Sequence, residues 1–198
     1  MIIGFYLLSL VSCNNLSSID TNENNEINDS IISWIAQSKN RKLDISIREE
    51  ALQKAFEKAN TLRTDSIKST YYSKISLEAD NLNSEQLFRE VNFKALALAN
   101  KLRDTFKIGD AHWNYASFYS KKEIVDSAYY HYHEAYKNFK LLKHEYFTAK
   151  MLYNMGFIQG RLKDYTGSEV LIFEALTMYI KLNKNLSISS FLWSMAVL

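Results

Sequence analysis

Four alanines recur along the chain at intervals of 40 residues, and this spacing limits the fold more than any other feature. They are Ala55, Ala95, Ala135 and Ala175. The positions four and seven beyond each alanine repeat in the same register without a gap, and the latter are Leu62, Leu102, Leu142 and Leu182. A fixed period of this length is typical of a solenoid, in which each unit packs mainly against its neighbours.

Within one unit, the apolar residues have the spacing of helices. In the last complete unit one stripe has residues three or four positions apart: Ser168, Ile172, Ala175, Tyr179 and Leu182. A weaker stripe precedes it between Leu152 and Gln159. The polar Lys163-Asp164 pair between them predicts a turn, with Asp164 capping the second helix. Each unit is therefore expected to be two antiparallel helices.

A column of small residues runs through the other half of the unit: Ser76, Ala116, Gly156 and Ala196. Small side chains let the helices of a pair approach closely. The chain has no proline and only 5 glycines, which favours long helices over tight-turned β structure. We therefore expect an all-α fold, an α-solenoid of helix hairpins with a 40-residue period.

The sequence resembles the tetratricopeptide repeat family over residues 44–198. The family's motif of large, small and aromatic residues is matched by Leu152, Met155-Gly156, Ser168, Ile172 and Ala175-Leu176. The preceding unit follows it more closely, with Tyr115-Ala116, Tyr119, Ala128, Tyr132 and Ala135. Two departures are the 40-residue period, where the family has about 34, and the missing proline that closes each unit. The resemblance implies a right-handed superhelix.

In this family the first helix of each unit lines a concave groove that binds a peptide or a partner protein. Mapped residue by residue, the resemblance places ten residues there: Asp110, Trp113, Asn114, Ser117, Lys121, Lys150, Tyr153, Asn154, Phe157 and Arg161. Amides can bond a peptide backbone, cations can meet carboxylates, and aromatic rings supply apolar area. The alternative is that the asparagines bond within the array and the charges form a solvated face.

The N-terminal segment indicates export. Residues 2–11 are mostly apolar and too short to span a bilayer, but they fit a secretory signal. Leu10-Val11-Ser12-Cys13 resembles a bacterial lipobox, although no basic residue precedes the apolar run. We expect residues 1–13 to be a signal segment with lipidation at Cys13, residues 14–29 a disordered tether, and residues 30–198 the repeat array. The alternative is a cytoplasmic protein with an apolar end.

The sequence offers little chemistry. We expect no catalytic residue, cofactor or metal site, because it contains no phosphate loop or nucleophile elbow. Residues 144–148 begin like HExxH, but Thr148 replaces the second histidine. His131 and His133 lie about 200° apart around a helix and are expected at the surface or in the groove. The packing stripe includes Tyr129, Tyr132, Tyr136 and Phe139, so we expect core packing rather than base stacking.

These features predict a non-catalytic interaction or sensor module with a protein or peptide partner. The net charge of +2 is too small to indicate a nucleic-acid partner. Long proline-free arrays of this composition look like the sensor regions of Bacteroidetes-type signal-transduction regulators, which continue into a histidine kinase or a DNA-binding domain. The alternative is a stand-alone lipoprotein adaptor. Residues 186–198 form half a unit, which predicts either a longer protein or self-association through that uncovered helix.

Overall fold

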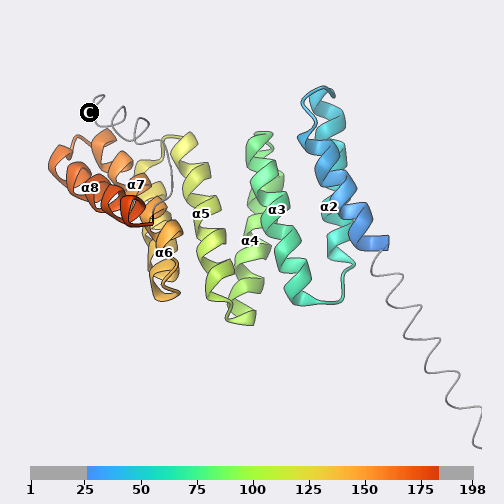
Figure 1. Ribbon diagram of the computed structural model, residues 1–198. Helices are drawn as coiled ribbons and strands as arrows, with labels where there is room; N and C mark the ends of the chain where they lie inside the picture. The colour runs from blue at the N-terminus through green and yellow to red at the C-terminus, as the bar shows by residue number, and fades with distance from the viewer. Residues whose placement is uncertain (1–25, 183–198) are drawn as a thin grey trace, which may run out of the picture.

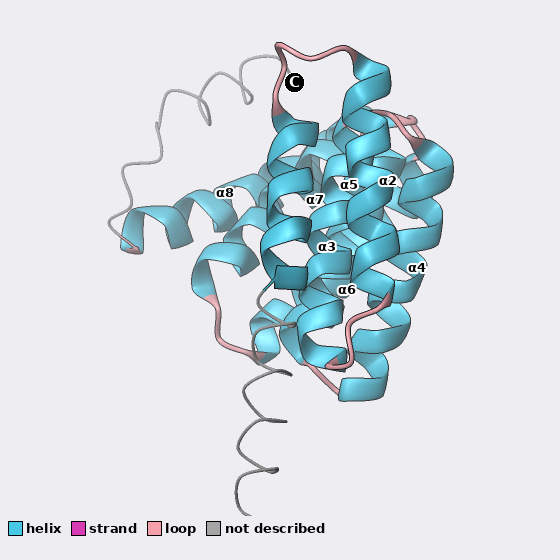
Figure 2. Cartoon of the chain, turned by 90° about the vertical axis from the view of Figure 1, so that its right-hand side faces the viewer, coloured by secondary structure: helices cyan, strands magenta, loops and turns pink. Residues whose placement is uncertain are grey.

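The structure, a computed structural model, describes residues 26–182 of the chain. Within this range it has eight helices and no strand. Figure 1 and Figure 2 show how the helices are arranged. A first helix covers residues 26–39. It is followed by α2 (Ile45–Asn60), α3 (Asp65–Asn81), α4 (Glu85–Leu102), α5 (Thr105–Lys121), α6 (Val125–Leu141), α7 (Glu145–Arg161) and α8 (Tyr165–Lys181). The expected all-α repeat fold is confirmed.

Two predicted segment boundaries, at residues 29–30 and at residue 186, lie close to the ends of the described range. Residues 26–29 belong to the first helix, whereas the sequence placed them in the tether. The signal segment with Cys13, the rest of the tether and the half-unit at 186–198 lie outside the described residues.

Consecutive helices form hairpins that stand side by side in chain order (Figure 1). The pairs are α3 with α4, α5 with α6, and α7 with α8. The first helix supplies Ile31 and Ile35 to the same core as Leu52 and Ala55 of α2, so these two helices also pack together. Each 40-residue unit of the sequence is therefore one hairpin, and neighbouring hairpins bury one another's apolar faces.

One type of turn closes the helices from α3 to α7. Each turn has one residue in the left-handed region, and these residues are 20 positions apart: Asn83, Arg103, Glu123, Lys143 and Lys163. The next amide donates to a carbonyl five residues back, at 2.9 to 3.0 Å. This is the Schellman pattern, formed here without the glycine that it usually has. The regular spacing divides every unit into two equal halves.

The repeat columns form the core. All four alanines of the 40-residue series are at most 3% exposed. At Gly156, an added Cβ would lie 2.7 Å from Ile172 Cγ1 and 3.0 Å from the Ser168 carbonyl oxygen. The close approach of α7 and α8 that the small-residue column predicted is therefore confirmed. The predicted cap is also present, because the Asp164 side chain accepts a bond from the Gly167 amide at 2.9 Å.

The leucine column does not continue the core as the stripe suggested. Leu62 is 4% exposed, whereas Leu102 and Leu142 are 37% and 44% exposed. Leu102 is the last residue of α4, and Leu142 follows the end of α6, so both lie at turns. The predicted aromatic packing holds, since Tyr132 and Phe139 are buried in the α5–α7 core.

Candidate binding surface

The ten predicted groove residues come from two first helices of neighbouring hairpins, five from α5 and five from α7. In each helix they stand at matching positions on one side, and we call the surface that the ten residues form the α5–α7 face. Trp113 joins the two helices: its ring centroid lies 5.6 Å from that of Phe147. The Lys150 ammonium lies 4.5 Å from the Trp113 centroid, a cation–π distance.

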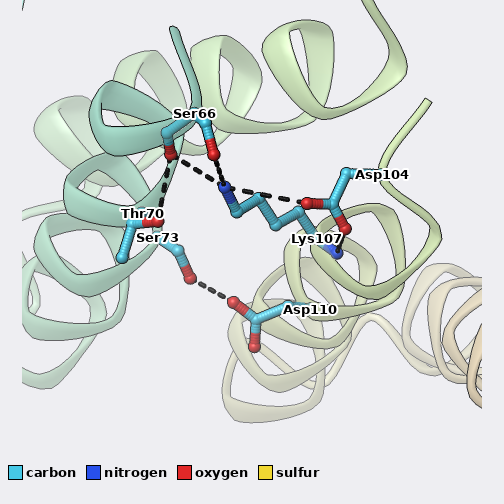
Figure 3. Close-up of polar contacts among 6 residues, drawn as sticks. All are labelled: Ser66, Thr70, Ser73, Asp104, Lys107 and Asp110. Carbon is cyan, nitrogen blue, oxygen red and sulfur yellow. Dashed lines mark hydrogen bonds and ion pairs between the residues drawn. The ribbon is translucent and has the colours of Figure 1, made fainter. Parts of the chain in front are cut away.

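Asp110 is engaged by the preceding hairpin. Figure 3 shows its carboxylate and the Ser73 hydroxyl of α3 pointing toward one another, joined by a hydrogen bond. Burial raises the pKa of Asp110, and the Ser73 bond opposes that shift. Beside them, the Lys107 ammonium donates to the Ser66 carbonyl at 2.8 Å (Figure 3). These contacts fasten α5 to α3.

Two predicted cations of the groove also bond within the chain. The Lys121 ammonium lies 2.7 Å from the carboxylate of Asp80, which is 5% exposed. Ser117 donates to the same carboxylate at 3.4 Å. Arg161 donates to the Ser120 carbonyl at 3.3 Å and pairs with Glu123 at 3.0 Å. These groups connect neighbouring hairpins, an arrangement that neither the groove interpretation nor the solvated-face alternative included.

The other residues of the α5–α7 face differ in exposure. Phe157 is 45% exposed, and Trp113, Lys150, Tyr153 and Asn154 are half-buried. Burial lowers the pKa of Lys150, which forms no ion pair with a described carboxylate. The surface thus presents an aromatic ring beside a cation that has no anionic partner within residues 26–182.

Asn114 differs from the rest of the set. It is 6% exposed, and its side-chain nitrogen is buried without an acceptor among the described residues. An amide in this position is closed off from the surface. Whether the ten residues bind a peptide stays a prediction.

The sequence reasoning missed the partners of these residues because they are not in the 40-residue columns. Ser73 and Asp110, like Asp80 and Ser117, are 37 positions apart. The interval from Trp113 to Lys150 is the same. Side chains on the first helix of one hairpin therefore contact the first helix of the previous hairpin. The contact is offset by about one helical turn from the 40-residue repeat. A search for polar or aromatic pairs at this spacing would have found these three pairs, but not the partners of Lys121 and Arg161, which lie 38 to 41 positions away.

A histidine pair was also missed. His131 was expected at the surface or in the groove, but it is half-buried, with its Nδ1 2.9 Å from the Nδ1 of His112 on α5. Its ring stacks on Tyr115 and Tyr119 with centroids 4.9 and 5.5 Å apart. Burial, reinforced by His112, lowers the pKa of His131 to about 4. The repeat register could have revealed this pair, because both histidines stand in 40-residue columns whose other members are mainly apolar.

Other features have structural explanations. His144, which began the HExxH-like segment, is the N-cap of α7, where its Nδ1 accepts from the Phe147 amide at 3.4 Å. Among residues 26–182, no three His, Cys, Asp or Glu side chains are grouped to hold a metal ion. None of the helices in this range is long and apolar enough to cross a membrane.

Comparison with known proteins reveals the fold alone. No family model matches the sequence, and no curated protein matches it. Among solved structures, the chain is similar to BtubC (BKLC) from P. vanneervenii, with a TM-score of 0.67 and 18% sequence identity. The match covers 80% of this chain and 66% of BtubC. A similarity at this sequence identity supports an all-helical repeat fold for this chain and nothing more specific.

Proposed function

We propose that this chain is a non-catalytic interaction module of the tetratricopeptide type, which binds an acidic peptide segment on its α5–α7 face. One observation carries the proposal: the Lys150 ammonium is half-buried over Trp113 and has no carboxylate partner among the described residues. Taking a cation out of water is unfavourable unless an opposite charge compensates. A carboxylate of a bound peptide would supply that charge.

The neighbouring side chains suit the rest of such a peptide. Phe157 and Trp113 offer apolar area, and Trp113 also has an N–H donor. Lys121 and Arg161 are excluded from this role because they already bond within the chain. Binding is therefore expected to depend on Lys150 more than on any other predicted groove cation.

Peptides selected on the wild-type chain from a random display library would test this proposal. We expect an acidic residue close to apolar residues, and at least tenfold weaker binding to Lys150→Glu. Lys42→Glu is the matched control, since Lys42 is exposed in the loop before α2. Selected peptides that bind Lys150→Glu as tightly as the wild type would show that the proposed surface is wrong.

We further propose that the module acts at the cell envelope, anchored by a lipid at Cys13, within a signal-transduction protein or as a stand-alone adaptor. The apolar run before Cys13 and the lipobox-like residues support this. Cells grown with an alkyne-tagged fatty acid should label the wild-type chain but not Cys13→Ser. An intact mass well above 23.0 kDa in native cells would favour the larger signalling protein over the adaptor.

A further inference from the structure

A cleft of about 520 Å³ lies between the start of α6, the end of α7 and the N-cap of α8. Its walls carry three rings, from Tyr129, Tyr130 and His133. Two carboxylates, Asp126 and Asp164, line it as well, and no lysine or arginine does among the described residues. It is separate from the α5–α7 face and shares no residue with it.

The corresponding boundary one unit earlier contains the chain's own cations. The charged groups of Arg89 and Lys122 lie 4.9 and 5.8 Å from the centroid of the Phe118 ring. Both cations also pair with Glu85, each at 2.8 Å. At that boundary, a cation between a ring and a carboxylate is therefore part of the packing.

The cleft lacks these cations. Tyr129 stands 40 residues after Arg89, and Leu162 stands 40 residues after Lys122. Neither Asp126 nor Asp164 has a cationic partner among the described residues. The cleft thus has rings and carboxylates at other positions than Phe118 and Glu85, and no described lysine or arginine lines it.

One hydrogen bond engages the carboxylates of the cleft among the described residues. One oxygen of Asp164 accepts from the Gly167 amide, which leaves its other oxygen and both oxygens of Asp126 for a ligand. A ligand with several donors in one plane would satisfy such a set of oxygens.

We propose that this cleft binds the guanidinium group of an arginine on a partner protein. A guanidinium stacks on aromatic rings and offers five N–H donors to carboxylates, which an ammonium cannot match. The cleft would then hold an arginine where the preceding boundary holds Arg89.

The experiment titrates the full chain with Nα-acetyl-arginine-N-methylamide and follows amide NMR signals. We expect saturable shifts confined to residues 126–133 and 159–164, and none with the citrulline analogue, which has the same shape without the charge. The double variant Asp126→Asn with Asp164→Asn should bind at least tenfold more weakly. Asparagine remains a good N-cap, so the helix should persist.

Two further variants sharpen the test. Asp104→Asn is the matched control, because Asp104 is likewise an N-cap that accepts a backbone amide, at the start of α5. It should bind as the wild type does. Leu162→Lys restores the cation of the preceding unit and should block the cleft. Absence of saturable shifts, equal binding of the citrulline analogue, or wild-type binding by the double variant would overturn the proposal.

Discussion

Two serines in the repeat core differ in whether the hydroxyl has a partner. Ser76 and Ser168 are both fully buried. Ser76 donates to the Asn92 side-chain oxygen at 2.9 Å, whereas the Ser168 hydroxyl has no partner among the described residues. A buried polar group without a hydrogen bond is unfavourable, and removing one partner of a formed bond leaves the other unsatisfied.

Alanine substitutions should therefore act in opposite directions at these two sites. Ser168→Ala should raise the free energy of unfolding by about 1 kcal/mol, while Ser76→Ala should lower it by about 1–2 kcal/mol. Denaturant unfolding of both variants against the wild type measures the difference. A loss of stability in Ser168→Ala would show that its hydroxyl does have a partner in solution.

The pair of His131 and His112 should make the fold sensitive to acid. The folded pKa of His131 is lowered from 6.5 to about 4, so the unfolded chain binds the proton more readily. Stability from this group is present above pH 6.5 and is lost as pH falls toward 4. The loss should be smaller than ~1.4 kcal/mol per pH unit, because the ring is partly screened. Glu134 opposes the shift and Lys137 reinforces that of His112.

Replacing both histidines by leucine should flatten this pH dependence. The register supports leucine, since Leu152 and Leu171 occupy the same columns one unit later. Unfolding free energies measured between pH 7 and 4 compare the double variant with the wild type. His133→Gln, at an exposed site on α6, is the control and should keep the wild-type slope. An unchanged slope in the double variant would contradict the assignment.

At the scale of elements, two ion pairs of equal length connect different helices. One connects the first helices α5 and α3 of neighbouring hairpins, and the other connects α4 and α3 within one hairpin. Lys121 with Asp80 and Lys101 with Asp65 both measure 2.7 Å. The side chain of Asp80 is 5% exposed, whereas that of Asp65 is 34% exposed. A carboxylate that loses its cation is penalised mainly where it is buried.

Lys121→Met should therefore lower stability by about 1–2 kcal/mol, and Lys101→Met should lower it much less. In a double-mutant cycle, Asp80→Asn should recover much of the loss in the Lys121→Met background. Thermal or denaturant unfolding of the four variants measures both effects. Equal losses at Lys121 and Lys101 would mean that burial of Asp80 adds nothing to the connection.

At the scale of the whole molecule, the sequence was sufficient to predict the hairpin array. The alanines and the small residues of the column that contains Gly156 recur every 40 residues, and the helices pack against one another at these positions. The turns were harder to predict, because a residue such as Lys163 adopts the left-handed conformation where glycine is the usual signal. Leu102 and Leu142 of the leucine column were misjudged because a turn begins at each of them.

The candidate surface was predictable only in part. Periodicity places Trp113 and Lys150 on one side of their helices, but it does not reveal which cations bond within the chain. That depends on the offset between neighbouring helices, which brings Lys121 to Asp80. The cleft proposed to bind arginine lies between the start of α6, the end of α7 and the N-cap of α8. Only the three-dimensional structure brings its two carboxylates, Asp126 and Asp164, to one site.

The array has several hydrophobic cores, which predicts that damage to one hairpin stays local. One core joins the first helix to α4 and adds Phe118, a second joins α5, α6 and α7, and a third joins α7 and α8. In a solenoid, stability is the sum of units and their interfaces, so separate parts can open separately. At Gly156, an added Cβ would lie 2.7 Å from Ile172 Cγ1, so α7 and α8 leave no space for a side chain there.

Gly156→Leu should therefore unfold α7 and α8 while the earlier hairpins persist. The side chain has no space against Ile172, and overpacking of this kind costs about 3 kcal/mol. Hydrogen exchange should accelerate in residues 145–181 and stay slow in residues 45–102. Glu169→Leu adds the same side chain at an exposed site of α8 and should leave both regions protected. Equal acceleration along the whole chain would mean that the hairpins unfold as one cooperative unit.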